Sequence, residues 1–281
     1  MGRKFIHFIL FFLLLPFQLH ADELTATFVK ALEAGDTGTI EKMLDKGFPL
    51  ETRFGSEDVT PLLLSAGKGM VDMSRLLLSR GADSEARDAQ GYTPVMLALR
   101  GGYLDVVDLL VSGGADIEAR DRDGNTLLLQ AIYHRNVSAA GFLLERGSEL
   151  DVRNNDGMTP LLYAARKGSP EIVTMLLARG ADPRARDNHG RTALALAADS
   201  GSRKVVELLF GDGSDLETPD KDGNTPLLLG ARGDVGVVEF LLSHGANPAA
   251  RNSDGLTALQ VAEQTGYEDM ITLLRSYQQK K

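Results

Sequence analysis

Hydrophobic and polar positions follow one short pattern that recurs along most of the chain. In residues 155–180 (NDGMTPLLYAARKGSPEIVTMLLARG), an apolar block opens at Thr159 and stops at Gly168. A second block stops at Gly180, and its apolar residues recur at helical spacing, which places them on one face of a helix. The pattern therefore predicts two short helices, each with one apolar face.

This unit recurs at a nearly constant interval. The first five steps between the threonines that open the first helix are 33 residues long, and the last step is 32. These threonines are Thr60, Thr93, Thr126, Thr159, Thr192, Thr225 and Thr257. The glycines that close the second helix keep the same interval: Gly81, Gly114, Gly147, Gly180, Gly213 and Gly245. A degenerate copy precedes them, so eight copies fill the chain from about Asp22 to Tyr277.

Local backbone chemistry explains the recurring residues. A threonine before proline is a favourable N-cap, and proline suits the first helical position because its missing N–H is not needed there. Glycine at a helix end allows the left-handed turn that a side chain would penalise. Helices this short are marginal alone, and each buried Leu or Ile contributes roughly 1.5–3 kcal/mol. Stacking of successive copies is therefore expected to make the chain fold.

The G-x-T-P-L opening, the A-A-x-x-G joint and the L-L-x-x-G-A-D close resemble ankyrin repeats. The resemblance covers nearly the whole mature chain. It implies an all-α solenoid of about eight helix-turn-helix repeats with β-turn or hairpin connections. It also implies that the chain binds proteins through its turn tips and through inner helices that line a concave groove. The repeat domain is expected over residues 22–281, with residues 22–54 as the N-terminal cap repeat and 255–281 as the C-terminal one.

The first residues have the pattern of a secretory signal peptide. Arg3 and Lys4 precede an apolar stretch at residues 5–17, and a small residue, Ala21, stands before a polar segment. The stretch is short for a membrane span of roughly 20 residues. We expect cleavage after Ala21, a periplasmic or secreted location, and no membrane contact afterwards. Leu19 is only a fair match to the cleavage pattern, so the alternative is an uncleaved anchor.

Composition narrows the classes of partner. The formal net charge is −9, and loss of Arg3 and Lys4 leaves 28 basic against 39 acidic side chains, a charge of −11. A surface this acidic argues against nucleic acid as a partner. The chain has no cysteine, which excludes disulfides and thiolate chemistry and, with the export signal, favours a bacterial periplasm.

The sequence has no catalytic, cofactor-binding or metal-binding motif with the residue spacing that its chemistry requires. The mature chain has three histidines, His134, His189 and His244, and none lies in a zinc-binding pattern. The turns at 121–125 and 220–224 are similar to calcium loops, but their glycine is fourth rather than sixth and no glutamate is twelfth. No phosphate loop or G-x-S-x-G elbow occurs. We therefore expect no enzyme activity, no cofactor and no metal.

Two rows of side chains mark the turns between copies. Arginines occupy one place in six copies, and acidic residues stand two residues before most of them. We expect a solvated ladder of ion pairs between neighbouring copies. Asx residues follow five of these arginines and Pro219, which interrupts the arginine row, and are expected to form turn bonds: Asp88, Asp121, Asn154, Asp187, Asp220 and Asn252.

The resemblance also implies which residues line the groove: the two before the joint glycine and the one before the opening threonine. The candidate partner-binding residues are Tyr92, Arg100, Asn125, Tyr133, His134, Met158, Arg166, Lys167, Arg191, Asn224 and Arg232. Several bases on one face of an acidic protein predict a basic, partly aromatic groove over copies three to five that accepts an acidic segment of a protein partner. The alternative is that these bases pair with carboxylates of neighbouring turns.

Two copies depart from the pattern. In copy four, Arg135 replaces the joint glycine, which costs about 1 kcal/mol unless Asn136 adopts the left-handed conformation instead. The residues at 139–141 in that copy are small, and we expect the bulky Ile132 and Phe142 to fill the space that they leave. The alternative is a gap beneath Tyr133. Copy seven is one residue short at 230–233, which predicts a weaker stack there.

Together these observations predict a monomeric, non-catalytic protein–protein interaction module that acts outside the cytoplasm. The alternative is a structural or self-associating scaffold, held at the membrane if the signal stays attached.

Overall fold

The computed structural model describes residues 23–211 and 215–278, and each repeat in it is a pair of helices. The first pair consists of helical residues 23–33 and α2 (Thr37–Asp45). In the later repeats the first helices are α3 (Pro61–Gly67), α5 (Pro94–Arg100), α7 (Leu127–Tyr133), α9 (Pro160–Lys167), α11 (Ala193–Asp199), α13 (Pro226–Gly230) and α15 (Ala258–Thr265). The second helices are α4 (Val71–Ser79), α6 (Leu104–Ser112), α8 (Val137–Glu145), α10 (Pro170–Leu177), α12 (Arg203–Gly211), α14 (Val235–Ser243) and α16 (Glu268–Gln278).

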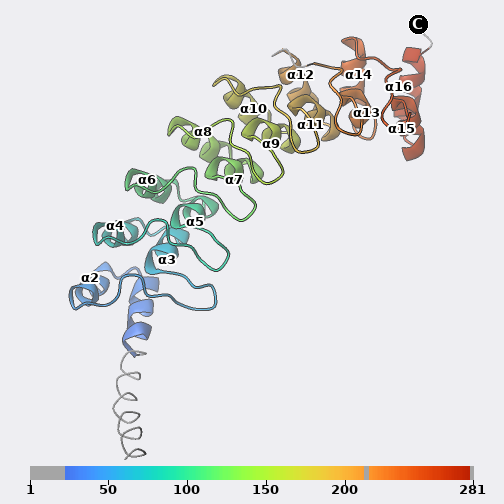
Figure 1. Ribbon diagram of the computed structural model, residues 1–281. Coiled ribbons are helices and arrows are strands. Elements are labelled where there is room, and N and C mark those ends of the chain that lie inside the picture. Colours follow the sequence, from blue (N-terminus) through green and yellow to red (C-terminus); the bar gives the residue numbers. More distant parts are fainter. Residues whose placement is uncertain (1–22, 212–214, 279–281) are drawn as a thin grey trace, which may run out of the picture. The chain divides into compact units, whose positions relative to one another are not determined.

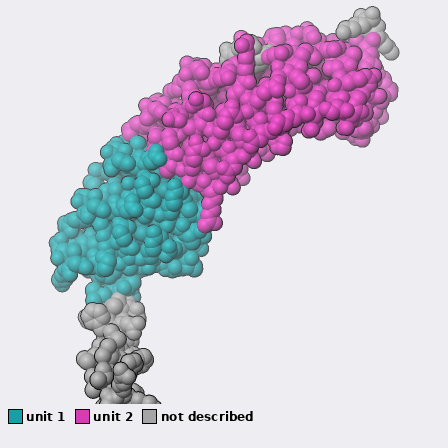
Figure 2. Space-filling view, viewed as in Figure 1, with its two compact units in different colours: residues 1–116 teal, residues 117–281 magenta. Residues whose placement is uncertain are grey.

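The chain divides into two compact units, residues 1–116 and 117–281, which Figure 2 colours separately. In the first unit α3 packs on α5, and α2, α4 and α6 pack in succession. In the second unit each first helix packs on the next one, from α7 to α15, and each second helix packs on the next one, from α8 to α16 (Figure 1). Each unit is therefore a two-layer stack of helix pairs, and the expected all-α repeat architecture is confirmed.

The predicted helix punctuation is present in the structure. Thr60, Thr159, Thr192 and Thr257 each accept a hydrogen bond from the backbone N–H three residues on. Gly168 and Gly180 have φ of +61° and +87°, the left-handed conformation that ends a helix. Helix boundaries thus follow from capping and glycine, as the sequence indicated.

Apolar packing joins the first helices of successive repeats. The position after T-P-L is leucine in most copies, and these side chains are at most 1% exposed: Leu63, Leu129, Leu162 and Leu228. Ala164, Ala165 and Ala197 are also fully buried, which lets the helices approach closely. Burial of this kind is the main favourable term in a repeat stack.

The turns between repeats are held by the Asx residues, as predicted. In all six copies the side-chain Oδ1 accepts from the backbone N–H groups two and four residues on. Successive turns also bond through the main chain, as where Asn155 N donates to Asp123 O and Asn188 N donates to Asp156 O. Within the described residues the turns contain no strand, only one isolated bridge between Phe54 and Val59.

The two rows of side chains in the turns bond the main chain of neighbouring repeats, whereas the expected ion pairs between the rows stay a prediction. The acidic row accepts from the backbone N–H of the next repeat at 2.8–2.9 Å, at Glu51, Glu85, Glu118 and Glu217. The basic row donates to the carbonyl of the arginine one repeat on, at Arg53, Arg120 and Arg153. The main chain of the next copy lies within reach of both rows, so side chain-to-backbone bonds link the repeats.

In copy four, the structure shows which residue takes the left-handed conformation that glycine has in the other copies. Arg135 has a φ of +53°, whereas Asn136 has a φ of −83° and caps α8 by accepting from Ala139 N. Arg135 therefore takes the left-handed conformation itself. Ile132 is fully buried, and a Cβ placed on Gly141 would lie 3.7 Å from Met175 Sδ, so Met175 of the following repeat packs there.

Copy seven is shortened as its sequence suggested. Its first helix, α13, has five residues, whereas the first helices of the repeats from α3 onward otherwise have seven or eight. Whether this stack is weaker stays a prediction.

The predicted signal peptide, residues 1–21, lies outside the described residues. In the part of the chain that the structure does describe, no helix has the length and apolar character needed to cross a membrane.

Candidate functional site

An aromatic and basic group of side chains gathers where α7 and α9 end. The two helices pack against each other in the second unit. We call this group the Tyr133 cluster, and its members are Tyr133, His134, Arg135, Tyr163, Arg166 and Lys167.

The lysine lies between two tyrosine rings. Lys167 Nζ is 3.9 Å from the centroid of the Tyr133 ring and 5.8 Å from that of Tyr163. The two ring centroids are 6.2 Å apart, and the His134 ring meets Tyr133 edge-on at 5.0 Å. An ammonium over an aromatic face is attracted by the ring's negative face, so Tyr133 holds the lysine in place without neutralising it.

Local geometry brings these residues together. Tyr163 and Lys167 are four residues apart on α9, so they share one face of that helix. Tyr133 is the last residue of α7, and the left-handed conformation of Arg135 ends that turn. The Arg135 Nη2 group donates to the carbonyl oxygen of Lys167, which ties the two helix ends together.

The two tyrosine side chains of the cluster differ sharply in solvent exposure. Tyr133 is 52% exposed, the largest value among the exposed large hydrophobic side chains, whereas Tyr163 is 9% exposed. Burial raises the pKa of the Tyr163 hydroxyl, and nearby Arg166 partly offsets this. Tyr163 is therefore part of the buried packing, whereas the ring of Tyr133 is accessible at the surface.

The basic members of the cluster repel one another. Burial lowers the pKa of Lys167, and the like charges of Arg166 and Arg135 lower it further. Over residues 23–211 and 215–278, none of these three cations forms an ion pair with a carboxylate. Three positive charges without an ion pair near an exposed ring would favour an approaching anion.

Pairing with neighbouring carboxylates, the alternative to a basic groove, does occur elsewhere. Lys68 Nζ lies 3.5 Å from Glu33 Oε1, and Arg191 Nη2 lies 2.8 Å from Asp187 Oδ2. Ion pairing with carboxylates therefore accounts for the positions of Lys68 and Arg191, but not for those of the bases in the Tyr133 cluster.

In the first unit, taken by itself, Tyr92 and Arg100 form a smaller contact of the same kind. The guanidinium carbon of Arg100 lies 5.5 Å from the centroid of the Tyr92 ring. Arg100 is exposed at the end of α5.

Two residues expected to face a partner are buried, which corrects their placement on the surface, and two others are part-buried and held by their own turns. Met158 is fully buried and Asn224 is 8% exposed. Asn125 donates to Asp121 and accepts from Asn154, and Arg191 is held by Asp187. All four precede the opening threonine, and the side chains of Asn125, Arg191 and Asn224 donate to the aspartate four residues earlier in the same turn. Arg232 is exposed just after α13.

Two members of the cluster were missed by the sequence analysis. Tyr163 stands at a position that is leucine or glutamine in neighbouring copies, and Arg135 looked like a defect at a glycine position. The four-residue spacing of Tyr163 and Lys167 was the signal that could have found the first.

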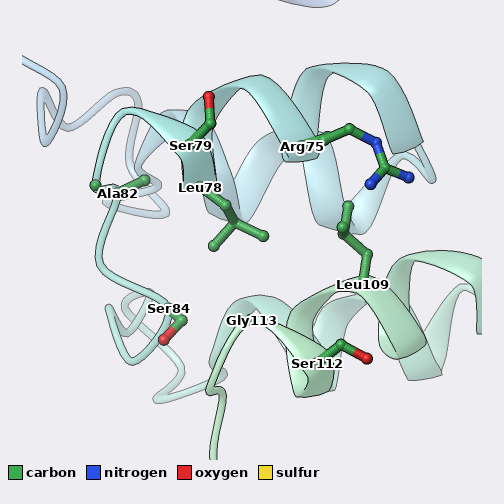
Figure 3. A pocket seen from close by; sticks show the side chains of 9 residues that line it. Arg75, Leu78, Ser79, Ala82, Ser84, Leu109, Ser112 and Gly113 are labelled. Atoms are coloured by element: carbon green, nitrogen blue, oxygen red, sulfur yellow. The ribbon is translucent and has the colours of Figure 1, made fainter.

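The first unit also has two surface hollows. One, of about 530 Å³, lies between α4 and α6, where Leu78 and Leu109 point into the gap and Arg75 stands at one end (Figure 3). The other, of about 950 Å³, is lined by the first repeat, including Leu24, Met43 and Phe48. Neither brings together titratable groups that suggest a reaction. No group of three or more His, Cys, Asp or Glu side chains suited to hold a metal ion occurs within residues 23–211 and 215–278.

The stacked helix pairs and the capped turns define a helical repeat protein. The chain belongs to the ankyrin-repeat family, because the family model for ankyrin repeats in three copies matches residues 28–121, 81–154, 128–220 and 209–281. Members of this family are generally non-catalytic interaction modules.

Curated relatives are similar over a short segment. The horse (Equus caballus) protein named ankyrin repeat, SAM and basic leucine zipper domain-containing protein 1 is 41% identical over 64 residues, 23% of this chain and 13% of the relative. Its rabbit (Oryctolagus cuniculus) counterpart is 38% identical over 66 residues, 24% of this chain and 14% of the relative. Neither name denotes an enzyme, and this chain matches only about one seventh of the length of either relative.

Proposed function

We propose that this chain is an exported protein-binding module that holds an acidic segment of a protein partner against the Tyr133 cluster. The observation that carries the proposal is the set of three cations, Arg135, Arg166 and Lys167, that stand around an exposed tyrosine without a carboxylate partner in the described residues. Such a surface attracts carboxylates and gives an apolar side chain a ring to pack on.

The surrounding charge supports a selective rather than a general attraction. The mature chain carries a net charge of −11 once the predicted leader is removed, so long polyanions meet repulsion over most of the surface. A short acidic segment that reaches only the cluster avoids that repulsion. This favours a protein partner over nucleic acid, and a site shared by the ends of α7 and α9.

Action outside the cytoplasm rests on the first 21 residues. A basic start, a short apolar stretch and Ala21 before a polar segment support export with cleavage. N-terminal sequencing of the protein recovered from its native host tests this directly: we expect Asp22 as the first residue, and an intact Met1 would support a membrane-held scaffold instead.

Partner binding is tested by affinity capture with residues 22–281, tagged at the C-terminus, from the exported-protein fraction of the native host. A variant with Arg166→Glu and Lys167→Glu reverses the charge of the cluster, and Arg100→Glu probes the first unit separately. Arg184→Glu with Lys204→Glu is the matched control, because both side chains are exposed bases of the second unit outside the cluster.

The proposal expects a partner retained by the wild type and by the control but lost by the cluster variant. A partner held equally by all variants would place the binding surface elsewhere. If no partner is captured and mass rises with concentration, the chain is a self-associating scaffold rather than a binding module.

A further inference from the structure

Arg135 is the least expected member of the cluster, since a glycine stands at its place in the neighbouring repeats. We infer that Arg135 is retained there as a binding residue, and that with Lys167 it holds a carboxylate of the partner beside the exposed ring of Tyr133. This inference rests on the proposed function and names the chemistry of the same site.

The backbone conformation at Arg135 disfavours an arginine. The joint residue of other repeats is a glycine with positive φ, at Gly35, Gly69, Gly102, Gly168 and Gly201. Arg135 adopts the same conformation with a φ of +53°, which a side chain disfavours. The other non-glycine residue with positive φ in the described ranges is Asp58, a residue type that tolerates this conformation, and it is paired with Arg53. Unfavourable backbone conformations of this kind tend to mark functional positions.

The hydrogen bonds of the cluster leave donors for an external acceptor. The Arg135 guanidinium has five N–H groups, and the bond from Nη2 to the Lys167 carbonyl oxygen uses one of them. The Lys167 ammonium faces the Tyr133 ring rather than a carboxylate. Both cations are therefore held in place while their remaining donors stay available.

The exposed ring and the charges together select the class of ligand. A planar carboxylate matches the fork of an arginine and can bond the nearby ammonium at the same time. The Tyr133 ring, 52% exposed, offers an apolar surface next to that position. The ligand is therefore a peptide segment with an aspartate or glutamate beside a large apolar or aromatic residue.

The test is selection of random linear peptides displayed on phage against residues 22–281, followed by fluorescence anisotropy with the enriched peptide. We expect enriched sequences to carry an acidic residue next to a large apolar one. Arg135→Gly should weaken binding about ten-fold, which is the loss expected for one charge-assisted hydrogen bond. The same variant should melt close to the wild type, because glycine relieves the left-handed turn while the bond to the Lys167 carbonyl is lost.

Two further variants separate binding from folding. Arg135→Lys keeps the charge without the fork and should lie between wild type and Arg135→Gly in affinity. Arg184→Gly removes an exposed arginine elsewhere in the same unit and should leave affinity unchanged.

Three results would overturn the inference: no peptide enriched, peptides without carboxylates, or equal affinity of Arg135→Gly and wild type. If the wild type still captures a protein from the exported fraction through Arg166 and Lys167, only this inference fails and the proposed function stands.

Discussion

The Asx turns contain a pairing that a single isosteric substitution can break. Asn154 accepts from the N–H groups of Asp156 and Met158 at 3.0 Å, and its Nδ2 donates to Asn125 Oδ1 at 2.9 Å. Asn125 Nδ2 in turn donates to Asp121 at 3.3 Å, so Asn125 cannot simply reverse its amide. In Asn154→Asp the turn bonds remain, but a carboxylate oxygen faces an amide oxygen.

The expected loss of stability follows from these contacts. One neutral hydrogen bond contributes about 1 kcal/mol, and leaving a part-buried acceptor unsatisfied brings the loss to about 1–3 kcal/mol. Repulsion from the Asp121 carboxylate acts in the same direction. We predict that Asn154→Asp lowers the free energy of unfolding by about 2 kcal/mol at neutral pH.

Acid should reverse this loss, and the direction can be derived. The two backbone N–H donors of the turn favour the ionised form of the carboxyl group introduced by Asn154→Asp, whereas the Asn125 amide oxygen and the Asp121 carboxylate favour the protonated form, which regains a donor for Asn125. We predict that the second effect is larger, so that the pKa in the folded state is raised above its unfolded value. The deficit is then fully present above the folded pKa and shrinks as the pH falls toward the unfolded pKa.

Urea unfolding of residues 22–281 at neutral and at acidic pH measures both effects. Asn247→Asp is the matched control, because Asn247 accepts from Ala249 N in the same manner and aspartate already stands at this place in several copies. It should change stability by less than about 0.5 kcal/mol. The reasoning would be refuted if Asn154→Asp had the same urea midpoint as the wild type at neutral pH. It would also be refuted if the loss in free energy of unfolding were the same at acidic pH.

Three other predictions concern the ladder, the cluster and copy seven. Arg153→Ala removes bonds to the carbonyls of Gly157 and Arg186 and should lower the free energy of unfolding by about 1–2 kcal/mol in urea; an unchanged midpoint would contradict this. Peptide affinity should fall as the pH rises through the pKa of Lys167, which burial and the neighbouring arginines hold below that of an ordinary lysine. Anisotropy against pH should show a flatter profile for Lys167→Arg, and identical profiles would exclude a role for this lysine. Amide hydrogen exchange should be faster in residues 226–240 than in the equivalent residues of copy five, because α13 has only five residues, and slow exchange there would argue against a weaker stack.

Much of the fold could be predicted because its rules are local. A threonine cap and a glycine in the left-handed turn act within a few residues, so helix ends could be assigned from the interval alone. The bonds of Asp187 and Asn154 within their own turns were predictable for the same reason.

The candidate site was less predictable because it depends on contacts between copies. Arg153 and Glu118 are within reach of the main chain one repeat away, which no single copy reveals. Met158 was placed on the surface by its position in the repeat, yet its side chain is fully buried. The role of Arg135 emerged only when its guanidinium was found on the Lys167 carbonyl, at the end of a different helix.

The central claim is that the surface around Tyr133 touches a protein partner outside the cytoplasm. A photo-crosslinking amino acid placed at Tyr133, in the full chain produced by its native host, tests this most directly, with Glu239 on α14 as the exposed control position. The account predicts a cross-linked protein adduct in the exported fraction from position 133 and none from position 239. Equal adducts from both positions, or none from position 133 while the chain is exported and folded, would contradict it.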